Sequence, residues 1–204
     1  MLQYVRRVSA LSACLLLAAS CAPATPLPAA EDDKGKATDL KLDKETMVIL
    51  DKDRNGMAAK TVLISTPTCM HYTLAPVVDG IKSRKEMGWQ EAAWASEEDE
   101  APHGIEIQFA KPVRGGRFQV TWAYDINNED GGRWWISRDY EIQTKEKLGA
   151  AWKTVVCVKG NQSAIGSYPM PDDPFSFLRI VQMPGGGHPK RPNLMWVGQV
   201  ELTD

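Results

Sequence analysis

Hydrophobic and polar residues alternate along several short stretches in the last three quarters of the chain. The alternation is clearest at 105–109 and 118–122, and it continues at 140–142 and 156–158. A period of two is typical of strands that bury one face. Glycine-rich segments such as 185–187 separate the stretches, as turns between short strands require. The pattern predicts an all-β protein in which antiparallel sheets pack face to face.

The first residues have the pattern of an export signal. Arg6 and Arg7 precede an apolar stretch, 8–19, which is too short to span a bilayer comfortably. Small residues then lead to Cys21, as at a bacterial lipoprotein cleavage site, so we predict a signal peptide over 1–21 and a lipid anchor on Cys21. Cleavage after Ala24 or Ala30 by an ordinary signal peptidase is the alternative. Either way, we expect an exported protein of the bacterial cell envelope, anchored to the membrane or periplasmic or secreted.

The next segment, 22–45, is rich in Ala, Pro, Asp and Lys and contains no aromatic residue. It has little to bury, which predicts a flexible linker. The remaining residues, 46–204, suit one domain with a full core. The whole chain has 24 basic and 26 acidic residues. Loss of Arg6 and Arg7 with the signal leaves 22 against 26, a net charge of −4, which argues against nucleic acid as a partner.

Two cysteines, Cys69 and Cys157, belong to the predicted domain. In an exported protein they could form a disulfide. The alternative is that each is a small buried apolar residue, and the sequence leaves both open because spacing does not fix geometry.

Seven runs, in the same order along the chain, resemble discoidin domains, also called coagulation factor V/VIII C-type domains. The runs are Asn55–Lys60, Val77–Gly80, Trp94–Ser96, Ile105–Val113, Asp139–Gln143, Ala151–Val155 and Phe177–Ile180. The resemblance implies a galactose-binding-like jelly-roll β-sandwich of two antiparallel sheets, with ligand loops at one end. Carbohydrate-binding modules share this fold, so the resemblance also implies glycan binding. We expect Trp94, Trp122 and Trp152 to pack in the core.

Many discoidin-like domains hold calcium beside the Asp-Gly turn, so the resemblance implies a calcium site at Asp79, Ser83 and Gln199. The positions that are usually acidic are Lys82 and Gln199 here, which weakens a site for a hard cation. Asp79 and Gly80 also suit a plain turn. The acidic run 97–100 is a rival metal site, although such runs usually form solvated loops.

The segment 123–138 is the candidate ligand site, because it is long and polar and interrupts the alternation. It contains Asn128, Arg133, Trp134 and Trp135. An indole face stacks on the C–H groups of a sugar, while Asn and Arg bind hydroxyl groups. The alternative is that one of the two tryptophans fills the end of the sandwich. A glycine-rich loop that carries His188 is a second candidate for the same site, or else a purely structural crossover.

Sequence features of an enzyme are absent. His71, His103 and His188 are scattered, and no Gly-x-Ser-x-Gly or zinc-ligand spacing occurs. We therefore predict a non-catalytic module that binds a polysaccharide or glycoconjugate, with no required cofactor. A scaffold domain that grips another envelope protein and binds no sugar is the alternative.

Overall fold

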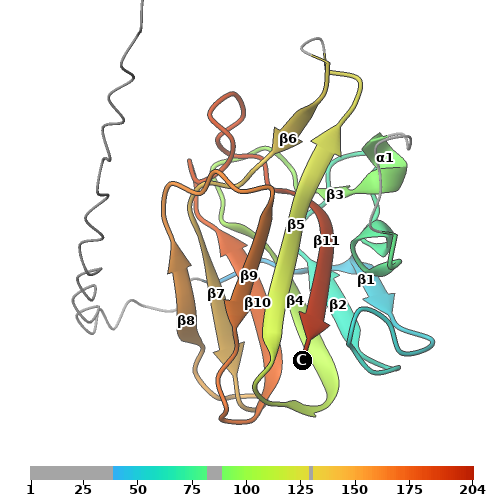
Figure 1. Cartoon of the computed structure of the whole chain (residues 1–204), viewed down its shortest axis with the longest axis vertical. Coiled ribbons are helices and arrows are strands. Elements are labelled where there is room, and N and C mark those ends of the chain that lie inside the picture. Colours follow the sequence, from blue (N-terminus) through green and yellow to red (C-terminus); the bar gives the residue numbers. More distant parts are fainter. Residues whose placement is uncertain (1–38, 82–88, 129–130) are drawn as a thin grey trace, which may run out of the picture. The chain divides into compact units, whose positions relative to one another are not determined.

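The computed structural model describes residues 39–81, 89–128 and 131–204. Their strands form two antiparallel sheets that face each other (Figure 1). The six-stranded sheet has the order β1 (Asp43–Ile49), β2 (Val62–Ser65), β4 (His103–Val113), β10 (Phe175–Gln182), β7 (Tyr140–Lys145), β8 (Lys153–Val158). The five-stranded sheet has the order β3 (Trp94–Ala95), β11 (Trp196–Thr203), β5 (Arg117–Asp125), β6 (Arg133–Trp135), and β9 (Ile165–Pro169) also pairs with β5. Two short helical turns complete the described elements: η1 (Ala75–Val78) and α1 (Trp89–Ala92).

The core between the sheets follows from the alternation in the sequence. On β5, Phe118, Val120 and Trp122 are completely buried. The facing sheet contributes Ile105 and Ile107 of β4, which are also buried. Full burial of such side chains stabilises the fold by about 1.5–3 kcal/mol each. The predicted all-β, galactose-binding-like sandwich is confirmed.

Two of the three tryptophans that were predicted in the core are there. Trp94 and Trp122 are fully buried, and Trp94 Nε1 donates to Thr68 Oγ1 at 2.9 Å. The prediction for Trp152 is wrong, because its ring lies half-buried on the outer face of the six-stranded sheet. There the guanidinium carbon of Arg179 lies 4.1 Å from the ring centroid. The indole covers a buried cation instead of filling the core.

Regular structure is present before the predicted domain boundary at residue 46. Strand β1 starts at Asp43, and Leu40 is already buried, 7% exposed. Both lie in the predicted linker 22–45. Strand β1 lies at the edge of its sheet, and most of its side chains are exposed. Its sequence therefore lacks a clear alternation of apolar and polar residues. Residues 1–38, with Cys21, lie outside the described residues, so the export signal and the lipid anchor remain predictions.

The two cysteines of the domain are both free. Cys69 is half-buried and packs against a small apolar cluster that contains Trp135 and Trp196. Cys157 is exposed on β8. The disulfide alternative is therefore wrong, and only Cys69 partly fits the role of a buried apolar residue. No helix in residues 39–81, 89–128 and 131–204 is long and apolar enough to cross a membrane.

Candidate functional site

The site begins with a hairpin that extends the five-stranded sheet. Strand β5 continues past Trp122 and pairs with β6, with Tyr124 opposite Trp134. Figure 1 shows this hairpin projecting above the other strands. Gly131 and Gly132 have φ of 82° and 109°, which favours glycine in the turn. The prediction that 123–138 is a loop outside the strand alternation is thus wrong for 123–125 and 133–135, which pair as strands.

Trp135 faces a small apolar cluster on one side of the hairpin. Only 8% of it is exposed, and its ring stacks on Trp196 with centroids 5.4 Å apart. Ala93, Ala95, Ala123 and Leu194 complete the cluster beside it. Trp135 therefore serves packing, in a cluster separate from the core between the sheets, whereas the alternative interpretation placed one tryptophan at the end of the sandwich.

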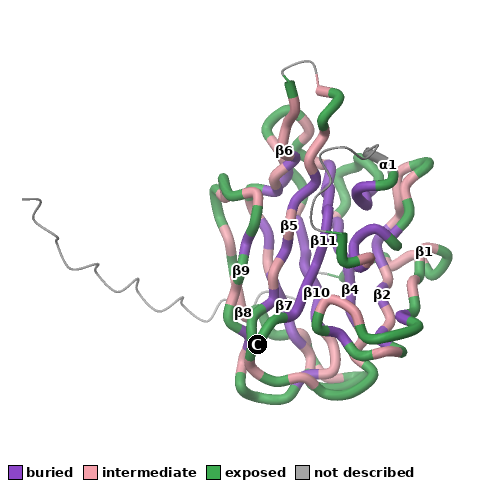
Figure 2. Tube along the Cα trace, turned by 45° about the vertical axis from the view of Figure 1, so that its right-hand side comes forward, coloured by how far each residue is buried: buried purple, intermediate pink, exposed green. Residues whose placement is uncertain are grey.

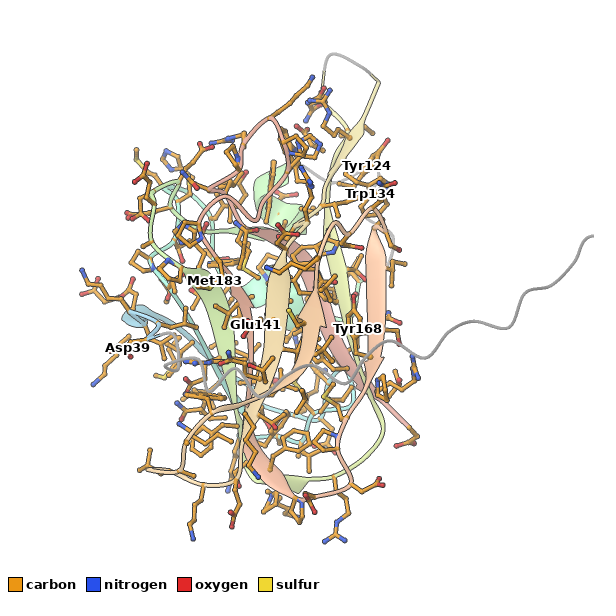
Figure 3. All side chains as sticks on the ribbon, turned by 90° about the vertical axis from the view of Figure 1, so that its left-hand side faces the viewer. Asp39, Tyr124, Trp134, Glu141, Tyr168 and Met183 are labelled. Carbon is orange, nitrogen blue, oxygen red and sulfur yellow. The ribbon has the colours of Figure 1, made fainter. Side chains whose placement is uncertain are left out.

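Trp134 lies on the opposite side of the hairpin, because successive residues of a strand point to opposite faces. It is half-buried, and its ring centroid is 5.0 Å from that of Tyr124. We call Tyr124 and Trp134 the aromatic pair. Figure 3 shows them side by side, above Tyr168 of β9. Figure 2 shows that burial is less complete along the hairpin than in the strands below it.

The structure gathers some of the predicted ligand residues and separates others. The guanidinium carbon of Arg133 is 5.6 Å from the Trp135 ring centroid, and the His188 ring is 5.0 Å from the same ring. These three residues lie together. Trp134 points to the other side, and Asn128 lies at the hairpin turn, where its carbonyl accepts from Gly131 N at 2.9 Å.

The loop between β10 and β11 (residues 183–195, the His188 loop) is held by its glycines. Gly186 O accepts from Arg138 N at 2.7 Å and from Asp139 N at 2.9 Å. A Cβ on Gly186 would lie 2.4 Å from Asp139 O, so only glycine permits this approach. This close approach sets His188 beside the β6–β7 connection.

The loop between β8 and β9 (residues 159–164) is also hydrogen-bonded to the β6–β7 connection (residues 136–139). Asn161 N donates to Arg138 O at 2.8 Å, and Asn161 Nδ2 donates to Ser137 O at 3.0 Å. Gly160 N donates to Asp139 Oδ1 at 2.8 Å. Three connections that are distant in sequence therefore meet at residues 137–139.

These connections line an open pocket of about 430 Å³, within the range of small-molecule sites. We call it the His188 pocket. Its lining residues are Ile136, Arg138, Gly160, Asn161, Gln162, His188 and Pro189. Of these, only His188 was predicted as a ligand residue. Arg138, Asn161 and Gln162 carry no local motif, since only the meeting of the three connections makes them neighbours.

A hydrogen bond to the backbone fixes the tautomer of His188, which lines the pocket. Its Nδ1 accepts from Lys190 N at 3.2 Å, which assigns the ring hydrogen of the neutral form to Nε2. Burial lowers the pKa of His188 below its usual 6.5, and the nearby charges of Arg133 and Lys190 lower it further. The imidazole is therefore neutral at pH 7 and offers an N–H donor.

The acidic run 97–100 is an exposed loop that makes ion pairs. Glu98 binds Arg191 of the His188 loop, with Arg191 Nε 3.0 Å from Oε2. Asp99 Oδ1 lies 3.4 Å from His103 Nε2. Within the described ranges, no three His, Cys, Asp or Glu side chains gather as a metal-binding group. The run is therefore a solvated loop, as the sequence predicted, and its side chains contact Arg191 and His103.

The Asp-Gly turn behaves as the turn that the sequence predicted. Asp79 Oδ1 accepts from Ile81 N at 2.8 Å, and Gly80 has φ of 81°. Gln199 is buried on β11, against which η1 packs, and its Nε2 has no hydrogen-bond partner. Ser83 lies outside the described residues. This set supplies a single carboxylate, whereas calcium prefers several oxygen ligands with carboxylate charge, and calcium binding here stays a prediction.

The sequence matches no protein-family model and no curated protein, but the fold matches solved structures. A chitosan-binding module of a Paenibacillus sp. IK-5 chitosanase/glucanase aligns with a TM-score of 0.52 and 14% identity, over 76% of this chain and 97% of that one. A Streptococcus pneumoniae fucose-binding module gives 0.53 and 14%, over 74% and 98%. The family 32 carbohydrate-binding module of Clostridium perfringens NanJ, in complex with galactose, gives 0.51 and 11%, over 71% and 93%. The domain therefore has the discoidin-like, galactose-binding fold of these modules, as its sequence motifs predicted.

Proposed function

We propose that this domain is a non-catalytic glycan-binding module and that the His188 pocket is its binding site. The observation that carries the proposal is the pocket itself. Three connections build it at one end of the sandwich, and its lining combines the apolar side chains of Ile136 and Pro189 with the polar side chains of Arg138, Gln162 and His188. A sugar ring presents both kinds of surface, with C–H groups on its faces and hydroxyl groups at its rim.

The aromatic pair offers a second surface, on the side of the hairpin away from His188. Trp122 and Tyr124 are two residues apart on β5, so both point to the inner side of the sheet. Trp122 meets the facing sheet, whereas Tyr124 lies beyond it. The β8–β9 loop reaches this level, because Trp122 N donates to Ala164 O at 3.0 Å. We infer that Tyr124 and Trp134 offer an indole face for stacking on a sugar unit.

Two further observations support binding over catalysis. The modules of similar fold bind chitosan, fucose and galactose. In addition, among the described residues that line the pocket, the ionisable side chains are Arg138 and His188. This pair lacks the two carboxylates that most glycoside hydrolases use.

The experiment is a glycan array followed by affinity electrophoresis in gels that contain the soluble polysaccharides it selects. We expect the parent protein to be retarded. Trp134→Ala and His188→Ala should weaken the retardation, whereas Trp152→Ala, a half-buried tryptophan on another face, should leave it unchanged. Absence of binding to every glycan, or equal binding by all three variants, would contradict the proposal. Retention of an envelope protein without any glycan would instead favour a scaffold role.

We also propose that the module is exported and tethered in the bacterial cell envelope through a lipid on Cys21. The support is the sequence pattern of basic, apolar and small residues that ends at this cysteine. Cys21→Ala should release the protein from the membrane fraction or block its processing. Unchanged fractionation and processing of this variant would exclude the lipid anchor.

A further inference from the structure

The His188 pocket has an unusual balance of hydrogen-bonding groups. Asn161 is already occupied by the protein, because its Nδ2 donates to Ser137 O and Ser163 O and its Oδ1 accepts from Ser163 N. His188 Nδ1 is occupied by Lys190 N, which leaves the Nε2–H donor. The side chains left for a ligand are those of Arg138, Gln162 and His188.

Donors dominate this set. The Arg138 guanidinium carries five N–H groups and no acceptor, and the neutral imidazole adds one N–H. Only the Gln162 amide supplies an acceptor oxygen. A neutral sugar hydroxyl both donates and accepts, so it is matched best by a mixture of donors and acceptors. A pocket rich in donors instead matches a group that only accepts, such as a carboxylate or a sulfate.

The charges around the pocket point the same way. Within the described part of the chain, no Asp or Glu lines it. The nearest carboxylate in sequence, Asp139, turns to Gly160 N at 2.8 Å. Arg133 and Lys190 lie close enough to lower the pKa of His188 by repulsion, and Lys159 is exposed beside Gly160. The described charges next to His188 and Gly160 are therefore cationic.

Arg138 is the group best placed to hold an anion. Its side chain is exposed at the pocket wall and makes no hydrogen bond or ion pair with a described residue. Its backbone is fixed on both sides, since its N donates to Gly186 O and its O accepts from Asn161 N. The planar guanidinium fork therefore starts from an ordered position and fits a carboxylate through two parallel hydrogen bonds.

We propose that the His188 pocket takes an acidic sugar unit, and that Arg138 holds its carboxylate or sulfate group. This proposal rests on the proposed glycan-binding function and specifies its ligand class. A uronate or a sulfated sugar satisfies the donors of Arg138 and His188 together, with Gln162 binding a neighbouring hydroxyl. Chitosan, which carries ammonium groups, finds no carboxylate in the pocket.

The experiment uses matched polysaccharides in affinity electrophoresis with the full chain. Polygalacturonate is compared with its methyl ester, which removes the charge and keeps the backbone, and dextran sulfate is compared with dextran. A galactan and chitosan are the remaining probes. We expect retardation by polygalacturonate or dextran sulfate and little by its uncharged partner. Selective retardation by polygalacturonate assigns a carboxylate as the bound group, and selective retardation by dextran sulfate assigns a sulfate.

Variants of two arginines separate specific contacts from general attraction. Arg138→Gln should weaken binding of the acidic polysaccharide by roughly 10- to 100-fold, the loss expected for hydrogen bonds to a charged group. Arg114→Gln changes an equally exposed arginine in the β4–β5 turn, at the other end of β5, and should leave binding as in the parent.

The outcomes separate this inference from the proposed function. Equal retardation by charged and uncharged partners, stronger binding of galactan or chitosan, or equal losses in the two arginine variants would overturn the acidic ligand and leave glycan binding in place. No retardation by any probe, together with a blank glycan array, would overturn the proposed function and this inference with it.

Discussion

The two halves of β5 have the same alternating pattern but different surroundings. In the first half, Phe118, Val120 and Trp122 are fully buried between the sheets. In the second half, Tyr124 has the same orientation but no facing strand, and its ring meets Trp134 instead. One strand therefore supports the core with its first half and the candidate site with its second.

The role of an aromatic residue on β5 therefore depends on what lies opposite it. Trp122 contacts Tyr140 of the facing sheet, with ring centroids 5.0 Å apart. The aromatic pair has the same centroid spacing but stays half-buried. An aromatic surface held by a rigid strand is suited to stacking, because little side-chain entropy remains to be lost on binding. Loss of Trp122 should therefore cost stability, and loss of Trp134 should cost affinity.

The largest effect is expected for Trp122→Ala. Removing a completely buried indole leaves a cavity in the core, and such changes cost about 3–5 kcal/mol of unfolding free energy. Urea denaturation measures this loss. A loss below 1 kcal/mol would show that the lower half of β5 is not the rigid support that the comparison requires.

Trp134→Ala should lower glycan affinity and change the unfolding free energy much less than Trp122→Ala does. Loss of one stacked ring costs roughly 1–3 kcal/mol of binding free energy, by analogy with aromatic stacking on bases, or about ten- to hundredfold in affinity. Its unfolding free energy should fall by less than that of Trp122→Ala. Isothermal titration with the selected oligosaccharide, beside urea denaturation, measures both quantities. Parent-like affinity would remove Trp134 from the site.

The strands of the core could be read from the sequence, because alternation is a local property. The pattern at Ile105–Phe109 and Phe118–Trp122 identified β4 and β5, and the discoidin-like motifs gave the sandwich that the structure shows. The edge strand β1 was missed because its side chains are mostly exposed. Its first residues therefore resembled a linker.

The site could be read only in part. The tryptophans and His188 stand out by residue type, and the glycines beside His188 mark a close backbone approach. The burial of Trp135 depends on Trp196, some sixty residues away in the sequence, and no local pattern records such a contact. Arg138 and Gln162 were missed for the same reason, since backbone bonds between three distant connections bring them together.

A smaller effect is expected for the ion pair between Glu98 and Arg191. Both side chains are more than a third exposed, so Glu98→Gln should change stability by at most about 1 kcal/mol. The bonds to Gly186 O hold the His188 loop, so glycan affinity should stay within about twofold of the parent, since this corresponds to less than 1 kcal/mol. A tenfold loss would show that the ion pair, and not the glycine contact, positions His188.

The smallest effect concerns the titration of His188. Its pKa lies below the ordinary 6.5, first through burial and then through Arg133 and Lys190. The folded state therefore resists protonation, and stability is lost as the pH falls from 6.5 through the lower folded value. Nuclear magnetic resonance of the imidazole Cε1–H should show this lowered pKa, and Arg133→Gln should raise it. A value at or above 6.5 in the parent would contradict the burial of the ring beside the basic groups.

The most direct measurement follows the indole N–H signals of the seven tryptophans during titration with the selected oligosaccharide. Glycan binding at the hairpin end predicts that the Trp134 signal shifts most, together with the His188 ring, while the signals of Trp94, Trp122 and Trp152 stay in place. A saturating titration that moves Trp152 and leaves Trp134 and His188 unchanged would contradict it.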